Sequence, residues 1–298
     1  MSDAAAAGLQ RLSAGPQRLS TEPPRLSAEP PRLSSEPTRL TTEQIAGLFD
    51  LSGKTALITG AAGVLGGTLA KGLALYGADI CLTDLALPAL EPLAGEIRSL
   101  RRRAVALACD VTEEAGVRGM VDAAAAEFGK VDILVTCAGI SNRFPAEDFP
   151  PDEFDRVMRV NVRGTFLCCQ AAARHMIARG GGKIITIGSV RGFLGSPVGN
   201  GGYTTSKGAV HLLTKQLATE WAKYHINVNS IAPTVFRTPL TQDVLGNEEA
   251  SRWIVSRIPW GRTAEPDDFV GAAVYLASAA SDFVTGFILS VDGGCVAG

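Results

Sequence analysis

The 298-residue sequence has no marked excess of charge, few histidines and no long apolar run. Its 28 basic and 30 acidic side chains leave a formal net charge of -2, and no cluster of Lys and Arg offsets this balance locally. We therefore expect no nucleic-acid partner. No segment approaches eighteen uninterrupted apolar residues, and the first residues lack the basic-then-apolar order of a secretory signal. We expect neither a membrane span nor export.

The cysteines and histidines do not have the spacing of a metal site. The six cysteines include no CxxC pair, and His175, His211 and His225 are too scattered to suggest a set of ligands. We therefore expect no metal ion, and a metal-dependent hydrolase is the least favoured class of enzyme. Most cysteines lie inside apolar runs, which is typical of small core residues in a reducing compartment. The expected location is cytoplasmic.

The first fifty residues differ in composition from the rest of the chain. Arg-Leu-Ser or Arg-Leu-Thr recurs with a period of seven, at Arg11, Arg18, Arg25, Arg32 and Arg39. A coiled coil is excluded because each repeat offers one apolar residue instead of two and because prolines recur in the stretch. Glutamates in the same stretch argue against an organelle transit peptide. We predict a disordered low-complexity tail over residues 1–50, with a docking role as a less favoured alternative.

From residue 51 onward, short apolar runs alternate with longer segments of helical period. Seven strands are predicted, at Thr55–Thr59, Asp79–Thr83, Ala104–Cys109, Ile133–Cys137, Lys183–Ile187, Ile226–Ile231 and Phe287–Val291. Helical stretches fall between them, for instance Leu65–Tyr76, Glu113–Phe128, Phe154–Ile177 and Thr205–Tyr224. This alternation predicts one α/β domain over residues 51–298, with a doubly wound, seven-stranded parallel sheet of the Rossmann type. Ligands are then expected at the carboxyl ends of the strands.

A glycine-rich loop follows the first predicted strand, with a glycine at every third position. The loop residues expected to contact a dinucleotide are Gly60, Gly63, Val64, Leu65 and Gly66. Glycine permits a tight turn from strand to helix, and it lets backbone N–H groups and the helix N-terminus approach a pyrophosphate. Such a loop alone is weak evidence, because a tight turn of purely structural use has the same appearance.

A carboxylate ends the second predicted strand, eighteen residues after Gly66. Asp84 could accept hydrogen bonds from both hydroxyls of an adenosine ribose. A 2′-phosphate would meet this carboxylate as a like charge, and neither Leu85 nor Ala62 offers an arginine to hold it. The expected cofactor is therefore NAD, and a solvated strand end is the alternative reading of Asp84. Asp110 closes the third strand in the same way and is a candidate for the adenine amino group, with Val111 beside it.

Four polar residues later in the chain form a second constellation. Tyr203 and Lys207 lie at i and i+4 near the start of a predicted helix, and hence on one face. A phenol with a pKa of about 10 becomes a base near neutral pH only if about 4 kcal/mol stabilises the phenolate, which a nearby ammonium can supply. Ser189 follows the fifth strand, and Asn161 lies inside the preceding long helix. Each could be an ordinary cap, turn or helix residue, but together they favour a catalytic set.

Taken in order, these motifs resemble those of the short-chain dehydrogenase/reductase family, in its compact single-domain branch, from Leu51 to Gly298. The resemblance also rests on Asp110-Val111, Ala138-Gly139, Asn229 with Pro233, Thr238, and the terminal Val291-Asp292-Gly293-Gly294. It implies that Ser189 orients the carbonyl or hydroxyl and that Tyr203 exchanges the proton. Lys207 would bind the nicotinamide ribose and lower the tyrosine pKa, and Asn161 would hold a water in the proton relay.

The same resemblance extends to the cofactor, the substrate and the assembly. Further cofactor contacts are implied at Cys137, Ala138, Gly139, Pro233, Val235 and Thr238, besides Tyr203 and Lys207. A segment at about 234–262 would cover the substrate. A homotetramer or homodimer would form through the helical stretches Phe154–Ile177 and Thr205–Tyr224. Three positions depart from the family pattern: Val64 and Thr234 stand where glycine is usual, and Thr136-Cys137 replaces a pair of asparagines.

The predicted function is an NAD(H)-dependent oxidoreductase that interconverts a secondary alcohol and a ketone on a polyol or sugar acid. The loop from Gly63 to Gly67 resembles that of sugar-acid and polyol dehydrogenases in the family. Arg143, Arg191 and Arg237 fall on loops at the reactive edge, where an arginine could bind a carboxylate through two parallel hydrogen bonds. The alternatives are an NADH-linked reductase of 3-oxoacyl chains or apolar ketones, and a regulatory protein that binds a dinucleotide without turnover.

Overall fold

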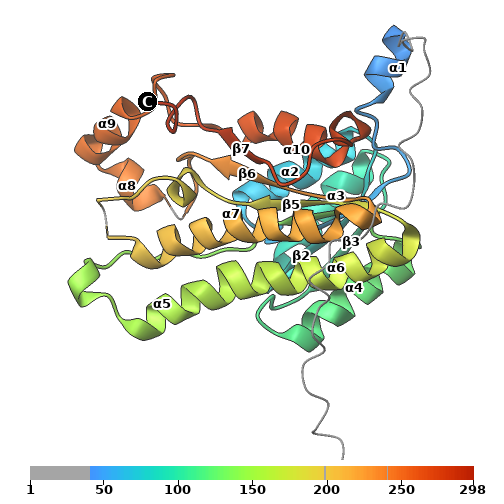
Figure 1. Cartoon of the computed structure of the whole chain (residues 1–298), viewed down its shortest axis with the longest axis horizontal. Coiled ribbons are helices and arrows are strands. Elements are labelled where there is room, and N and C mark those ends of the chain that lie inside the picture. The colour runs from blue at the N-terminus through green and yellow to red at the C-terminus, as the bar shows by residue number, and fades with distance from the viewer. Residues whose placement is uncertain (1–40, 198, 240) are drawn as a thin grey trace, which may run out of the picture. The chain divides into compact units, whose positions relative to one another are not determined.

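The computed structural model describes residues 41–197, 199–239 and 241–298 (Figure 1). The predicted tail therefore lies outside the described residues up to position 40. Within residues 41–50, Thr42–Gly47 forms the short helix α1, whose first turn is closed by reciprocal hydrogen bonds between Thr41 and Gln44. Phe49 then packs against the core and Leu51 is fully buried. One compact unit spans Thr41–Gly298.

Seven parallel strands form one sheet, as the sequence predicts. They are β1 (Thr55–Thr59), β2 (Asp79–Asp84), β3 (Ala104–Ala108), β4 (Ile133–Thr136), β5 (Gly182–Ile187), β6 (Ile226–Pro233) and β7 (Ile288–Val291). Their order across the sheet is β3-β2-β1-β4-β5-β6-β7, and every pairing is parallel. The chain reverses direction across the sheet between β1 and β4, which is the point where such folds open a crevice for ligands.

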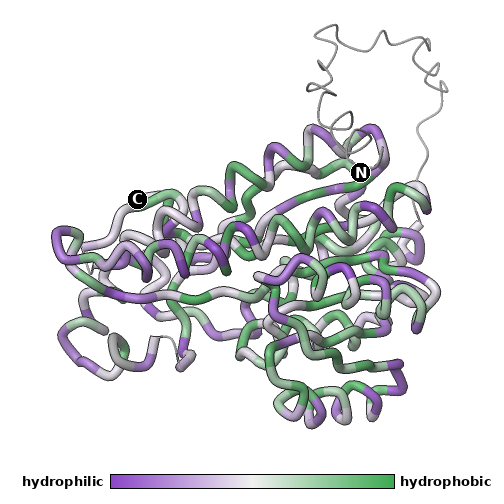
Figure 2. The backbone as a smooth tube through the Cα atoms, turned by 90° about the horizontal axis from the view of Figure 1, so that it is seen from below, coloured by the Kyte–Doolittle hydropathy of each residue, from purple (hydrophilic) through white to green (hydrophobic). Residues whose placement is uncertain are grey.

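Helices cover both faces of the sheet (Figure 1). On one face lie α2 (Val64–Leu75), α3 (Glu91–Ser99) and α10 (Val270–Ala277), and on the other lie α4 (Glu114–Phe128), α6 (Thr165–Arg179) and α7 (Gly201–Trp221). Figure 2 shows apolar and polar stretches alternating along the helical tubes, as expected for helices that bury one side. No helix in the described part of the chain is both long and apolar enough to cross a membrane.

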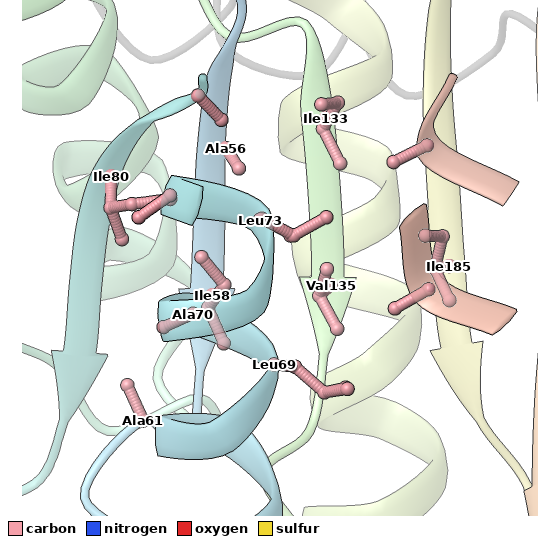
Figure 3. Packing of buried hydrophobic residues seen from close by; sticks show 14 of the residues in the cluster. Ala56, Ile58, Ala61, Leu69, Ala70, Leu73, Ile80, Ile133, Val135 and Ile185 are labelled. Carbon is pink, nitrogen blue, oxygen red and sulfur yellow. The ribbon is translucent and has the colours of Figure 1, made fainter. Parts of the chain in front are cut away.

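Strand alternation assigns each core residue to one of two layers. On β1, Ala56 and Ile58 belong to the cluster under α2 and α10, whereas Leu57 belongs to the cluster under α4, α6 and α7. Figure 3 shows Leu69 and Leu73 of α2 lying over the strands that carry Ile58 and Val135. Because side chains fill both faces, no ligand can enter through the layers, and a site is left only at the strand ends.

One predicted helix contains an irregular segment. The stretch expected as a single helix from 154 to 177 is built from α5 (Pro151–Met158), a π-helical segment (Arg159–Gly164) and α6. Asn161 lies in the middle of the π segment and is buried. Single π turns insert one residue into a helix and redirect the side chains that follow. The polar residue that the sequence placed mid-helix thus lies where the helix is locally widened.

The remaining elements are short. Two helices, α8 (Gln242–Gly246) and α9 (Glu248–Ser256), lie between β6 and α10 in the predicted covering segment. Single 3-10 turns occur at Leu87–Ala89, Ala146–Asp148, Val190–Gly192, Ala222–Tyr224, Pro266–Phe269 and Ala279–Ser281. The turn at Val190–Gly192 carries the chain from Ser189 toward α7, and it becomes important for the site.

Candidate active site

A cavity of about 780 Å³ opens at the carboxyl ends of the strands. Loops that follow β1 to β6 line it, together with part of the covering segment. Its lining includes every residue that the sequence assigned to cofactor contact: Gly60, Gly63, Val64, Leu65, Gly66, Asp84, Leu85, Asp110, Val111, Cys137, Ala138, Gly139, Tyr203, Lys207, Pro233, Val235 and Thr238. The structure therefore gathers these residues around one space, and their contacts with a cofactor stay a prediction.

The glycine loop has steric reasons for two of its glycines. Gly60 has a φ of +67°, and a Cβ there would lie 2.6 Å from the Ala138 nitrogen. A Cβ at Gly66 would lie 2.3 Å from the Gly60 carbonyl oxygen. The helix begins at Val64, one residue earlier than predicted, with Gly63 as an N-cap that offers no side-chain hydrogen bond. The first N–H groups of α2 are thus left for an anionic ligand.

Asp84 forms a hydrogen bond to the glycine loop and also lines the cavity. Its two carboxylate oxygens accept hydrogen bonds from the backbone N–H groups of Ala62 at 3.0 Å and Leu85 at 2.8 Å. Each oxygen keeps acceptor capacity for a further partner. Asp110 is exposed and accepts from the Thr112 N–H at 2.9 Å. Among the described residues that line the cavity after β1, β2 and β3, none is a lysine or an arginine.

Tyr203, Lys207 and Ser189 meet on the cavity wall. Lys207 is buried and its Nζ donates to the Ile187 carbonyl at 2.7 Å, while standing 5.5 Å from the centre of the Tyr203 ring. Burial lowers the pKa of Lys207 to about 8. The Ser189 hydroxyl accepts the Arg191 N–H at 3.1 Å and lies near enough to Tyr203 to lower its pKa. The predicted catalytic trio is therefore assembled from β5, the turn after it, and α7.

The acidity of Tyr203 is set by opposing effects. Burial raises the pKa of Tyr203, whereas the hydrogen bond from Ser189 and the positive charge of Arg191 lower it. Lys207 is not among the largest effects on this pKa, and its ammonium donates to the Ile187 carbonyl; the lowering that the sequence assigned to Lys207 stays a prediction. Arg191 thus has an electrostatic effect on Tyr203 that no motif had indicated.

Asn161 joins two loops instead of facing the cavity. Its amide nitrogen donates to the Ile140 carbonyl and to the Ser206 hydroxyl, each at 2.9 Å, and its amide oxygen accepts the Ile140 N–H at 2.8 Å. Ser206 in turn donates to the Tyr203 carbonyl at 2.7 Å. Both hydrogens of the Asn161 amide are therefore donated to groups within the protein. A water of the proton relay would have to bind to oxygen atoms at this place instead. The observed arrangement ties the loop after β4 to the helix that carries Tyr203.

The three arginines predicted to bind substrate divide into two groups. Arg143 and Arg191 line the cavity, but Arg237 does not, and it is exposed. Phe236 and Thr238, on either side of it, both line the cavity. The assignment of Arg237 to the substrate pocket is therefore not supported by its position.

Sequence reasoning missed several residues at this end. Arg156, Arg159, Ala250 and Ile254 line the cavity. Of the two tryptophans in the covering segment that the sequence offers for stacking on a sugar, Trp253 lines the cavity, whereas Trp260 lies outside the lining and is 75% exposed. Arg156 is paired with Glu153 at 2.7 Å. The one available signal was the position of Arg159 two residues before Asn161, but which side of a helix faces the cavity depends on the π segment, which periodicity does not reveal.

Comparisons with known proteins agree with this geometry. A family model described as enoyl-(acyl carrier protein) reductase matches residues 60–296. The gluconate 5-dehydrogenase of Gluconobacter oxydans is 43% identical over 247 residues, which cover 83% of this chain and 96% of that protein. The 2-dehydro-3-deoxy-D-gluconate 5-dehydrogenase of Dickeya dadantii is 43% identical over 254 residues, covering 85% and 99%.

A solved structure is similar over the same region. The gluconate 5-dehydrogenase from Burkholderia cenocepacia, in complex with NADP and tartrate, is 44% identical with a TM-score of 0.83, and the match covers 85% of this chain and 99% of that one. The fold, the cavity and these relatives define a nicotinamide-dinucleotide oxidoreductase that interconverts a secondary alcohol and a ketone. The chain belongs to the short-chain dehydrogenase/reductase family.

Proposed function

We propose that this protein is an NAD(H)-linked dehydrogenase that interconverts a hydroxyl and a ketone on a sugar acid. The observation that carries the proposal is the meeting of Ser189, Tyr203 and Arg191 on one wall of the cavity. The first two offer proton chemistry at a substrate oxygen, and the third offers a cation a few residues away. A gluconate 5-dehydrogenase and a 2-dehydro-3-deoxy-D-gluconate 5-dehydrogenase among the relatives act on this class of compound by name.

The residues divide the proton chemistry between them. In the oxidative direction Tyr203 Oη accepts the proton of the substrate hydroxyl, and Ser189 Oγ holds the same oxygen by a hydrogen bond. In the reductive direction Tyr203 returns the proton to the carbonyl oxygen. Lys207 and Arg191 add positive charge where the phenolate forms. A bound nicotinamide supplies hydride acceptance or donation, which completes the redox change.

Asp84 supports a preference for NAD over NADP. A 2′-phosphate at the end of β2 would meet the Asp84 carboxylate, which already holds two backbone N–H groups and so cannot swing away freely. No described lysine or arginine of the first three loops lines the cavity to offset that repulsion. The Burkholderia relative binds NADP in its solved structure. Cofactor choice in this chain therefore depends on local charge at Asp84 and is not inherited from the family.

Arg191 supports a carboxylate on the substrate. Its guanidinium lines the cavity, and Nη1 is held by the Gly195 carbonyl at 2.6 Å, which leaves other N–H groups of the fork for a ligand. Burial lowers the pKa of Arg191, so an anion beside it regains part of the cost of desolvation. An apolar ketone or 3-oxoacyl chain would leave this half-buried cation unpaired, which disfavours that alternative. A regulatory protein without turnover has no use for the assembled Ser189 and Tyr203.

The experiment compares a sugar acid with its uncharged polyol. We expect wild type to oxidise gluconate-type acids with NAD⁺, and Arg191→Ala to raise KM for the acid about tenfold more than for the polyol. Arg237→Ala is the matched control, because Arg237 is exposed and outside the cavity lining. Equal effects of Arg191→Ala on both substrates, or no acid oxidised by wild type, would contradict the sugar-acid assignment.

We further infer a homodimer or homotetramer in the cytoplasm. The helices that the family resemblance assigns to the interface carry exposed apolar side chains, Phe166 on α6 and Leu212 on α7, with exposed fractions of 37% and 69%. All six cysteines are free thiols, which suits a reducing compartment. Light scattering measures the mass in solution, and a monomer at micromolar concentration would contradict the assembly.

A further inference from the structure

His211 is a buried titratable side chain that the catalytic motifs do not use. It lies on α7, four residues beyond Lys207 and eight beyond Tyr203, so it shares the helix face that carries both. Only 6% of its surface is exposed. Buried polar groups are normally satisfied by hydrogen bonds, so the partner of this ring shows what it does.

The imidazole lies against the turn that presents Ser189. His211 Nε2 accepts the backbone N–H of Ser189, with 3.4 Å between the two nitrogens. Two glycines of the turn make room for the ring: a Cβ at Gly188 would stand 2.3 Å from Nε2, and a Cβ at Gly192 would stand 2.3 Å from Cε1. Real side chains do not approach so closely, so the ring reaches Ser189 only because both neighbours lack a side chain.

A second contact closes the other side of the ring. The Phe193 ring lies 4.5 Å from the imidazole, measured between ring centres, at an angle of 46°. Gly188 is also held by the Ile231 carbonyl and the Ser230 hydroxyl. The turn from 188 to 193 is therefore fixed to β6 at its start and to α7 through His211 along its length.

The protonation state of the ring agrees with this acceptor role. Burial, followed by the charges of Lys207 and Lys215 on the same helix, lowers the pKa of His211 to about 4. The ring is therefore neutral near neutral pH, and since Nε2 accepts a hydrogen bond, the proton resides on Nδ1. Nδ1 is buried and has no hydrogen-bond partner among the described residues. A purely apolar side chain would fill the space without that cost.

We propose that His211 is a positioning residue that fixes the Ser189 backbone and so directs the serine hydroxyl toward Tyr203 and the substrate oxygen. The Ser189 oxygen already accepts the Arg191 N–H, so the hydroxyl proton is free to be donated into the cavity. Movement of the turn redirects that proton without removing any catalytic side chain. The inference rests on the proposed function for the reaction that is measured, and on geometry alone for the contact itself.

Two variants of His211 separate the loss of the hydrogen-bond acceptor from a change in the shape of the side chain. His211→Phe keeps an aromatic ring between the glycines but cannot accept the Ser189 N–H, and we expect kcat to fall about tenfold with KM for NAD unchanged. In His211→Gln the side-chain oxygen can reach the place of Nε2, and most of the activity should return. His225→Asn, at an exposed histidine outside the cavity lining and outside both predicted interface helices, is the control and should behave as wild type, since asparagine tolerates its positive φ. A His211→Phe enzyme with wild-type kcat overturns the proposal.

A double-mutant cycle tests whether the effect runs through Ser189. In a Ser189→Ala background, His211→Phe should change the residual rate less than about twofold, because the hydroxyl to be positioned is gone. If the tenfold loss persists in that background, His211 acts through general stability or another group, and the proposal fails. Circular dichroism at the assay temperature confirms that each variant is folded.

A spectroscopic measurement needs neither a substrate nor a variant. Nitrogen-15 spectra of the wild-type imidazoles should show one histidine with a protonated Nδ1 and an unprotonated Nε2 throughout the range from pH 5 to 8. A His211 ring that carries its proton on Nε2, or that titrates in this range, overturns the contact. Absence of sugar-acid turnover would contradict the proposed function instead, so the two failures are distinguishable.

Discussion

Different kinds of chemical groups line the two halves of the cavity. Around β1, β2 and β3 the wall consists of backbone, small or aliphatic residues and two carboxylates, Asp84 and Asp110, so contacts come largely from N–H groups and from the absence of side chains. Around β4, β5 and α7 the wall consists of long polar side chains that come from distant segments. Changes in the first half should therefore alter fit and affinity, whereas changes in the second half should alter chemistry.

The largest expected effect lies in the chemical half. Tyr203→Phe should lower kcat by at least about a hundredfold, because only the exchangeable proton is lost. NADH binding, followed by fluorescence titration, should stay within about twofold, because the ring still fills its place between Ser189 and Lys207. Residual activity above about a tenth of wild type would remove Tyr203 from the proton path.

The next effect lies in the dinucleotide half and concerns packing. Gly66→Ala forces a Cβ to within 2.3 Å of the Gly60 carbonyl, a contact between rigid backbone segments, and should lower the free energy of unfolding by about 2 kcal/mol. Gly95→Ala is the matched control: it lies inside α3 with open space around it, and helix propensity predicts a gain of about 0.5 kcal/mol. Urea denaturation measures both. Equal midpoints for the two variants would show that the loop adapts to a side chain.

The third effect in size concerns the negative charge of Asp84, where the adenosine ribose is expected to bind. Asp84→Asn removes the negative charge and keeps one oxygen, which can still accept one of the two backbone N–H groups, of Ala62 and Leu85, that now bond to separate oxygens. The ratio of kcat/KM for NAD to that for NADP should fall about tenfold. Asp110→Asn, at the end of the next strand, should change both values in parallel because the adenine is common to both cofactors. A wild-type enzyme with equal values for the two cofactors would show that Asp84 does not face the ribose.

The same contrast explains how much could be predicted from the sequence. The strand positions and the contacts of the dinucleotide half follow from local order, since Gly60, Gly66 and Asp84 each stand at a fixed place relative to a strand end. The parallel sheet then determines which strand ends are neighbours. Local pattern and global fold agree here, and the prediction is confirmed for the fold.

The substrate half could be predicted only in part. Ser189, Tyr203 and Lys207 belong to a short motif, but the direction of Arg237 depends on the pairing of Phe236 with Ala264 and on the packing of Phe236 against Phe269. Such long-range contacts leave no local signal. The π segment around Asn161 and the packing of His211 against two glycines could not be predicted for the same reason. Each depends on the register of one element against another.

The smallest expected effect concerns the segment before the sheet, none of whose described residues lines the cavity. The helix α1 has no buried residue, so deletion of residues 1–45 should shift Tm by less than about 2 °C and leave kcat/KM unchanged. Extending the deletion to residue 51 removes Phe49, which packs against the core, and Leu51, which is fully buried, and should lower Tm by several times that amount. Differential scanning fluorimetry on both truncations measures the step. If the shorter deletion already lowers Tm by many degrees, the first forty-five residues pack on the domain and must be counted as part of its structure.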